Sequence, residues 1–269
     1  MTAEIVERVR RSVRYRDVDA ALLDRLAGEE LPRARNVDDA VKRVKRRLHQ
    51  AVGAYRGAAD ADGVLAPIRD AWNGDLTDDA FRAACRAALA RHASTAERLP
   101  HLERFFPAIW GLTGGPPHAL LDLGCGLGPL SLPWMGLPTG ATYRACDVDR
   151  RSLEVVEGFL SILGRPASVT ACDLVAAGPP RGRVDVAMLL KLVPLLDRQN
   201  PSAAQRCLAA LEAAHAVVSF PARSLGGRLR GMEATYRRRL DDLVAGLGIT
   251  EVREASVPNE LVFVLSLDG

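Results

Sequence analysis

The sequence predicts an α/β fold, an open and mostly parallel sheet of seven strands with one reversed strand, preceded by a helical N-terminal domain. Three observations predict it. Apolar residues recur at helical spacing up to about residue 114. Short apolar segments then alternate with helical stretches, which is typical of buried parallel strands joined by helices. The last two strands are separated by residues 258–260, and so short a connection forces an antiparallel pair.

The first part of the chain is predicted to be helical and to end at the breaker Gly114–Pro117. We therefore place the domain boundary after residue 114, which gives a helical domain of residues 1–114 and a sheet domain of residues 115–269. Three helices are predicted from a capping residue at their start: Val37–Tyr55 after Asn36, Asp78–Arg91 after Thr77, and a helix that reaches Trp110 after the capping box Ser94–Glu97.

The second part alternates between strands and helices. The predicted strands are Ala119–Leu123, Thr142–Asp147, Ser168–Cys172, Val184–Leu190, Ala216–Phe220, Glu251–Val257 and Leu261–Leu267. The predicted helices between them are Leu130–Met135, Arg150–Leu163, Ser202–Ala214 and Arg228–Leu247.

The composition excludes several classes of protein. The 269 residues are 48% hydrophobic and 26% charged, a balance that argues against a wholly disordered chain. No apolar run approaches the roughly 18 residues of a membrane span, and the charged start of the chain lacks the apolar region of a secretory signal. Five cysteines without a CxxC pair argue against a disulfide framework and a zinc ribbon. We therefore expect a cytoplasmic protein without a metal.

Basic residues are concentrated near the N-terminus. Residues 1–56 carry 14 basic and 9 acidic side chains, whereas residues 109–269 carry 16 of each. Arginine contacts phosphates in bidentate fashion, so this asymmetry indicates nucleic acid, although GC-rich coding also favours arginine over lysine and a basic helix face can simply be solvated. The predicted RNA-binding residues are Arg10, Arg11, Arg14, Lys42, Arg43, Lys45, Arg46 and Arg47.

The first strand of the sheet ends in a glycine turn that indicates a cofactor site. Asp122 is followed by Gly124, Gly126 and Gly128, which is the E/D-x-G-x-G form typical of S-adenosylmethionine binders. It departs from the nicotinamide and flavin fingerprint, in which the third glycine comes one residue later. The next two strands end at Asp147 and Asp173, where a carboxylate can hold a ribose diol and an adenine amine. The alternative is that such acids only cap the following helices.

At this point the sequence resembles the Arm-type 16S ribosomal RNA methyltransferases, which methylate N7 of guanosine 1405 and confer aminoglycoside resistance. The resemblance covers nearly the whole chain. Two segments, Leu189–Leu195 and Val218–Gly227, together with the helical N-terminal domain, make the resemblance more specific than the glycine turn alone would. It also includes His92–Leu99, Leu121–Gly126, Cys146–Asp149, Cys172–Leu174 and Gln199. It implies a class I S-adenosylmethionine-dependent methyltransferase with a Rossmann-like sheet.

The resemblance also implies roles for individual residues. The N-terminal domain would dock rRNA and cover the cofactor, S-adenosyl-L-methionine. The partner would be helix 44 of 16S rRNA in the 30S subunit, and we expect a monomer. The implied cofactor-binding residues are Gly124 and Gly126 at the methionine, Asp147 at the ribose, Asp173 and Leu174 at the adenine, Arg98 at the carboxylate, and His92, Ala93, Ser94, Tyr55, Leu190 and Gln199 around them.

The chemistry of the implied target needs few catalytic groups. N7 of guanine has a free lone pair and no proton to lose, so no general base is required. We assign Lys191, Arg223 and Ser224 to the target guanosine and its phosphates, and we expect the base to be flipped out of its helix. The alternatives are methylation of N1 of adenosine 1408, another RNA or a small-molecule target, and a non-catalytic RNA-binding module.

Overall fold

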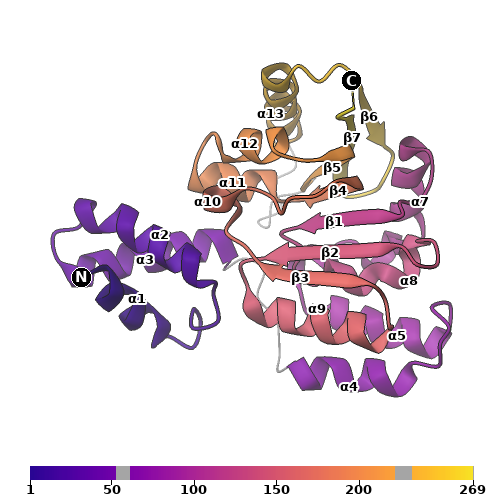
Figure 1. Ribbon diagram of the computed structural model, residues 1–269, viewed down its shortest axis with the longest axis horizontal. Coiled ribbons are helices and arrows are strands. Elements are labelled where there is room, and N and C mark those ends of the chain that lie inside the picture. The colour runs from indigo at the N-terminus through magenta and orange to yellow at the C-terminus, as the bar shows by residue number, and fades with distance from the viewer. Residues whose placement is uncertain (53–60, 222–231, 269) are drawn as a thin grey trace.

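A computed structural model of the chain describes residues 1–52, 61–221 and 232–268. Its centre is a seven-stranded sheet in the order β3-β2-β1-β4-β5-β7-β6 (Figure 1). The strands are β1 (Ala119–Leu123), β2 (Thr142–Asp147), β3 (Ala167–Ala171), β4 (Val184–Leu190), β5 (Ala213–Pro221), β6 (Val252–Ala255) and β7 (Glu260–Ser266).

The strand directions confirm the predicted sheet. Strands β1 to β5 pair in parallel, and β7 pairs antiparallel with both β5 and β6. The carboxyl ends of β1, β2, β3 and β4 therefore meet at one edge. The predicted helix Ser202–Ala214 is too long, because residues from Ala213 onward form β5 and pair with Val184 of β4. The alanine-rich sequence favours helix locally, and the sheet pairing overrides that preference.

Helices cover both faces of the sheet (Figure 1). One face carries α10 (Leu174–Ala177), α11 (Val193–Gln199), α12 (Ala203–Ala209) and α13 (Met232–Leu247). The other carries α9 (Arg150–Ile162) together with α4 (Ala61–Ala71), α5 (Asp79–Leu89) and α7 (Leu102–Thr113), while α8 (Leu132–Met135) follows the short turn η3 (Gly128–Ser131). Helices α10 and α11 were not predicted from the sequence.

The first three helices form a lobe of their own. Helices α1 (Thr2–Arg10), α2 (Ala20–Glu30) and α3 (Val37–Val52) pack around Ile5, Leu22, Leu26, Val44 and Leu48, with the turn η1 (Leu31–Arg33) between α2 and α3. We call residues 1–52 the N-terminal lobe (Figure 1). Helices α4, α5 and α7 instead share a core with α9 and the sheet. The domain boundary after residue 114 stays a prediction.

The predicted caps differ in their outcome. Asn36 caps α3, because its Oδ1 accepts a hydrogen bond of 2.9 Å from the Asp39 backbone N–H. The prediction for Thr77 is wrong. Asp78 caps α5 by accepting from the Phe81 backbone N–H at 2.9 Å, and Thr77 bonds to Asp75 instead. An ionised carboxylate one residue later is the stronger acceptor.

The third predicted helix is divided into three pieces. They are α6 (Ala93–Ala96), the turn η2 (Leu99–His101) and α7. Pro100 lies in the middle of the predicted span, where a proline lacks the N–H and clashes with the preceding turn. Ser94 lies within α6 and bonds to His92 rather than capping the helix. Among the described residues, no helix combines the length and the apolar character that crossing a membrane requires.

Candidate functional site

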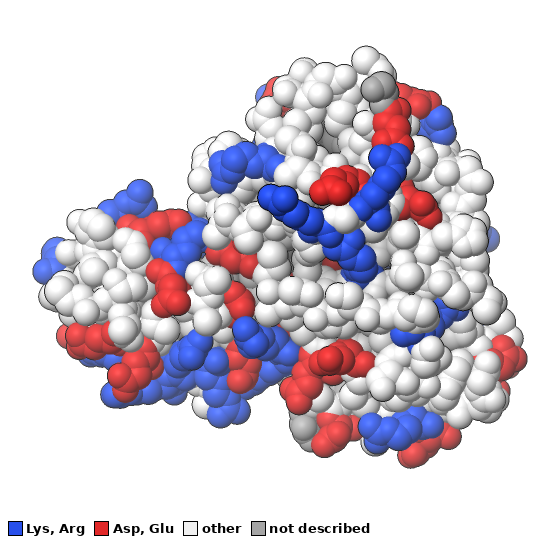
Figure 2. Space-filling model, in the orientation of Figure 1, with Lys and Arg blue, Asp and Glu red and all other residues white. Residues whose placement is uncertain are grey.

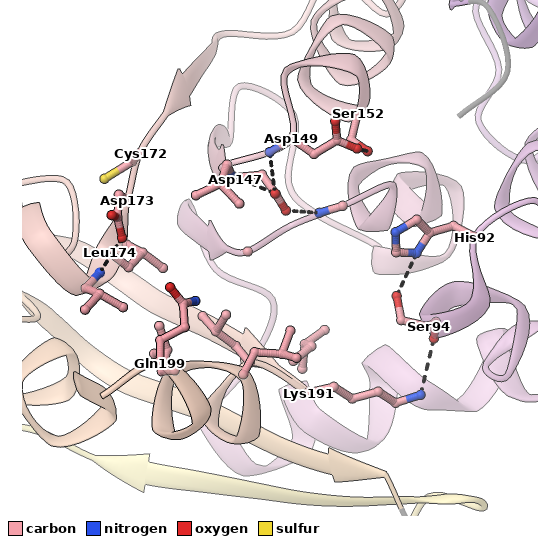
Figure 3. A pocket seen from close by; sticks show the side chains of 18 residues that line it. His92, Ser94, Asp147, Asp149, Ser152, Cys172, Asp173, Leu174, Lys191 and Gln199 are labelled. Carbon is pink, nitrogen blue, oxygen red and sulfur yellow. Dashed lines mark hydrogen bonds between the residues drawn. The ribbon is translucent and has the colours of Figure 1, made fainter. Parts of the chain in front are cut away.

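A pocket opens at the edge of the sheet where the carboxyl ends of β1 to β4 meet (Figure 3). It encloses about 770 Å³, part of it open to solvent. Ten residues that were assigned from the sequence line it: His92, Ser94, Gly124, Gly126, Asp147, Asp173, Leu174, Leu190, Lys191 and Gln199. The structure adds Val148, Asp149, Ser152, Cys172, Val175, Leu192, Leu195 and Leu196.

The glycine turn after β1 forms the floor of the pocket. Gly124 and Gly126 have φ angles of +62° and +50°, a left-handed conformation that L side chains rarely adopt. A Cβ on Gly124 would lie 2.7 Å from Leu192 Cδ1, and one on Gly126 would lie 3.1 Å from His92 Cε1. Both positions therefore require glycine for their backbone conformation and for the space beside them.

The motif acid Asp122 lies behind the pocket, in the core. Its Oδ2 accepts a 2.8 Å hydrogen bond from the Tyr143 hydroxyl. Burial raises the pKa of Asp122 to about 7. The hydrogen bond from Tyr143 lowers the pKa but does not outweigh the burial. A Cβ on Gly128 would lie 3.1 Å from the same Oδ2. Asp122 therefore packs against Gly128 of the turn from the core side and does not line the pocket.

Asp147 is held by the backbone of two neighbouring turns. Its Oδ2 accepts from the Gly126 N–H at 2.8 Å, and its Oδ1 accepts from the N–H groups of Val148 and Asp149 at 2.7 and 2.9 Å (Figure 3). Burial raises the pKa of Asp147, and the three backbone donors partly offset that rise. A carboxylate has about four acceptor positions, so Asp147, which lines the pocket, retains one on Oδ2.

Asp173 caps a helix and also lies at the pocket, while its contact with an adenine amine stays a prediction. Its Oδ1 accepts from the Val175 N–H at 3.0 Å and so caps α10, and the residue also lines the pocket. Asp149 likewise caps α9 and accepts from the Ser152 hydroxyl at 2.9 Å. The second partner of Asp173 is Arg25 of the N-terminal lobe, which the sequence did not indicate as a site residue.

His92 and Ser94 form the wall opposite Asp173 (Figure 3). The His92 Nδ1 and the Ser94 hydroxyl are 2.9 Å apart. Burial, together with the positive charges of Arg98 and Lys191, lowers the pKa of His92 to about 4, so the imidazole is neutral at pH 7. Ala93 is described by the structure but does not line the pocket.

Arg98 has a different partner from the one that was predicted. It is buried, and its Nε and Nη2 donate to the Glu260 carboxylate at 2.8 and 2.7 Å. Burial alone would raise the pKa of Glu260, but Arg98, Lys191 and the Ser219 hydroxyl outweigh it and the pKa is lowered. The assignment of Arg98 to a cofactor carboxylate stays a prediction. It would have to use the N–H groups that Glu260 does not engage, which are the two on Nη1 and the second one on Nη2.

Lys191 lies at the end of β4 as predicted, and it is almost fully buried. Its φ of +59° turns the chain out of the strand, and its backbone N–H donates to the Ser219 carbonyl at 3.1 Å. The Nζ bonds to the Ser94 carbonyl at 3.3 Å (Figure 3). It also bonds to Glu97 and lies 3.6 Å from Glu260 Oε2. A contact of Nζ with the target guanosine, which stays a prediction, would have to replace some of these partners.

Three assigned residues lie outside the described part of the chain: Tyr55, Arg223 and Ser224. Two residues next to the site were missed, the buried Glu260 and the half-buried Arg25. Glu260 is the first residue of β7, whereas the sequence predicts it in the turn before that strand, where an acid resembles an ordinary turn residue. Arg25 lies on α2, and nothing in its neighbourhood distinguishes it from a surface arginine.

The predicted RNA-binding residues fall into two groups. Arg43 donates to Glu30 at 2.7 Å, and Arg47 bonds to Glu29, Glu30 and the Gln199 carbonyl, so both hold the lobe together or join it to α11. Of the others, Lys45 is half-buried, and five are exposed: Arg10, Arg11, Arg14, Lys42 and Arg46. Of these, Arg11 pairs with Glu7 at 2.7 Å and Arg14 approaches His49 at 2.5 Å.

Known proteins share this architecture over almost the whole chain. The family model for ribosomal RNA methyltransferases (FmrO) matches residues 11–264. The 16S rRNA (guanine(1405)-N(7))-methyltransferase of Frankia casuarinae is 40% identical over 262 residues, covering 96% of this chain and 91% of that protein. That of Micromonospora echinospora is 35% identical over 266 residues, covering 97% and 95%.

A solved structure gives the same result. The 16S rRNA methyltransferase RmtF, crystallised in complex with S-adenosyl-L-homocysteine, superimposes with a TM-score of 0.83 at 31% identity, covering 98% of this chain and 97% of that one. Sequence and fold agree over both the N-terminal lobe and the sheet. The chain therefore belongs to the 16S rRNA (guanine(1405)-N(7))-methyltransferase family.

Proposed function

We propose that this protein transfers the methyl group of S-adenosyl-L-methionine to N7 of guanosine 1405 in 16S rRNA. We further propose that it acts as a monomer on helix 44 of the 30S subunit and so confers aminoglycoside resistance. The observation that carries the proposal is the pocket of glycine turn, Asp147 and Asp173 in a chain that is 40% identical to such an enzyme over 96% of its length.

The pocket residues fit this cofactor. The turn at Gly124 and Gly126 leaves out the two Cβ atoms that would crowd Leu192 and His92, so a ligand can approach the backbone there. Asp147 keeps an acceptor position for a ribose hydroxyl, and Asp173 lies at the end of the next strand with Gln199 beside it. When bound, the cofactor supplies an electrophilic methyl group on a sulfonium.

The side chains of the pocket suit a reaction without proton transfer. N7 of guanine offers a lone pair and has no proton to lose, so the protein has to position the base rather than deprotonate it. His92 is neutral at pH 7, and the charge of Lys191 is offset by Glu97 and Glu260. The ion pairs of Lys191 with Glu97 and Glu260 reduce the net positive charge next to the cationic sulfonium of the cofactor. We propose that Lys191, with Arg223 and Ser224, orients the flipped guanosine.

The N-terminal lobe is the proposed rRNA-docking surface. Lys and Arg side chains gather along its lower edge in Figure 2. Lys42 and Arg46 on α3 are exposed, and within the described residues neither has an ion-pair partner. Unpaired cations can release the counterions of phosphates, which gives nucleic-acid affinity and strong salt dependence.

The direct test incubates the purified protein with 30S subunits and tritiated S-adenosylmethionine. Borohydride and aniline then cleave the rRNA at N7-methylguanosine, and reverse transcription maps the break. We expect label in the 30S particle and a stop at guanosine 1405. Label without cleavage there, for example with a primer-extension stop at adenosine 1408, would contradict the proposal, and so would the absence of label.

A further inference from the structure

Arg25 on α2 reaches from the N-terminal lobe to the wall of the pocket. Its side chain is 13% exposed, and it does not line the cavity itself. The Nε donates to Asp173 Oδ2 at 2.6 Å, and Nη2 donates to Asp173 Oδ1 at 3.2 Å and to Gln199 Oε1 at 2.6 Å. One guanidinium thus holds two pocket-lining residues that come from different elements.

These contacts determine which groups the two residues offer to a ligand. Arg25 and the Val175 N–H occupy three of the four acceptor positions of Asp173, which leaves one on Oδ2. A guanidinium can only donate, so it fixes the Gln199 amide with Oε1 toward Arg25 and its NH2 group turned away. The two residues together offer one acceptor and one donor, the pattern that a nucleobase edge requires.

The same guanidinium is tied into the N-terminal lobe. Its Nη1 donates to Glu29 at 3.0 Å, and Glu29 also bonds to Arg47 of α3. Arg47 in turn donates to the Gln199 backbone carbonyl at 3.1 Å. The helix that carries the exposed cations Lys42 and Arg46 therefore contacts the pocket-lining residue Gln199 directly, through Arg47.

We propose that Arg25 is a positioning residue of the cofactor site: from the N-terminal lobe it orients Asp173 as acceptor and Gln199 as donor toward the adenine end of the cofactor. The proposal rests on the proposed function, since it assumes this cofactor. It makes cofactor affinity depend on a residue of the lobe that docks the rRNA. Arg25 itself touches no cofactor atom in this account.

A purely structural interlobe ion pair is the competing explanation, and the chain offers a matched control for it. Arg151 on α9 bonds to Asp17 and also joins the lobe to the sheet domain. Both of these side chains are about one third exposed, and neither residue lines the pocket. Arg151→Gln therefore weakens the same junction without altering Asp173 or Gln199.

The test measures the affinity for S-adenosylhomocysteine by calorimetry, with melting temperatures recorded for every variant. We expect Arg25→Gln to weaken binding about tenfold, since a buried charge-assisted bidentate contact to Asp173 is lost. The KM for S-adenosylmethionine on 30S subunits should rise similarly, with kcat within about twofold. Arg151→Gln should bind as the wild type does. Arg25→Lys keeps the charge but lacks the planar fork, so it should recover affinity only in part.

Two results would overturn the inference. One is an unchanged affinity in both Arg25→Gln and Arg25→Lys. The other is an equal loss in Arg151→Gln, which would make the effect a general one of the junction. Combining Arg25→Gln with Asp173→Asn should add little to either loss, and full additivity would also contradict a common role. A wild-type protein that does not bind S-adenosylhomocysteine would instead refute the proposed function, and the inference with it.

Discussion

Replacing Glu260 by glutamine tests the charge network behind the pocket. The change keeps the size of the side chain and removes the negative charge that Arg98 contacts at 2.7 and 2.8 Å and Lys191 approaches at 3.6 Å. Arg98 and Glu260 are 7% and 2% exposed, so water cannot replace the lost partner. Lys191 would keep Glu97, whereas Arg98 would be left as a buried cation with a neutral amide.

The expected magnitude follows from that burial. Removing one member of a buried ion pair typically costs about 3–5 kcal/mol. For a chain of this size each kcal/mol lowers the melting temperature by about 2 °C, so Glu260→Gln should melt about 6–10 °C below the wild type. The control is Glu97→Gln, because Glu97 is 41% exposed, so that water can replace part of its contact with Lys191 and the loss of stability should be smaller.

The pH dependence of this difference gives a second readout. The folded state lowers the pKa of Glu260, so its contribution is complete above the ordinary carboxyl pKa and is lost as the pH falls through the lowered value. Scanning calorimetry from pH 7 to pH 4 and below should therefore show wild type and Glu260→Gln converging in acid. A melting temperature within about 2 °C of the wild type at pH 7, or a difference that grows in acid, would refute the reasoning.

Three further outcomes follow from the site and the lobe. Gly126→Ala should weaken S-adenosylhomocysteine binding about tenfold in calorimetry, because its Cβ would lie 3.1 Å from His92, whereas Gly136→Ala, with a similar φ of +60° and open space around it, should leave affinity unchanged. Lys42→Glu with Arg46→Glu should abolish 30S pelleting while cofactor affinity stays as in the wild type; loss of both would contradict the docking role. NMR of His92 should show no titration between pH 8 and pH 5.5, in keeping with a pKa of about 4, and a midpoint near 6.5 would refute its burial.

The site residues that the sequence could predict are those that lie at the ends of the parallel strands. Gly124, Asp147 and Asp173 lie at or just after the ends of three consecutive strands, and parallel pairing brings these ends to one edge of the sheet. Local patterns also located the strands and the cap of α3. The helix predicted after Ser94 is divided at the turn that contains Pro100, a residue whose effect on a helix is a local property of the sequence.

The remaining features depend on contacts between distant residues. Glu260 is 162 positions from Arg98, and Asp173 is 148 positions from Arg25, so no spacing in the chain indicates these pairs. The five lysines and arginines of α3 look alike in the sequence, and their roles separate for the same reason. Arg43 and Arg47 face acidic residues of α2, while Lys42 and Arg46 face solvent.

The measurement that tests the central claim most directly is mass spectrometry of 16S rRNA from an aminoglycoside-sensitive bacterial host that expresses this chain. The nuclease fragment that contains guanosine 1405 should carry one added methyl group, and borohydride and aniline should cleave the rRNA at that nucleotide. The Asp147→Ala variant should leave the fragment unmodified. A fragment without the added methyl group in cells that contain the folded protein, or a methyl group on another nucleotide instead, would contradict the account.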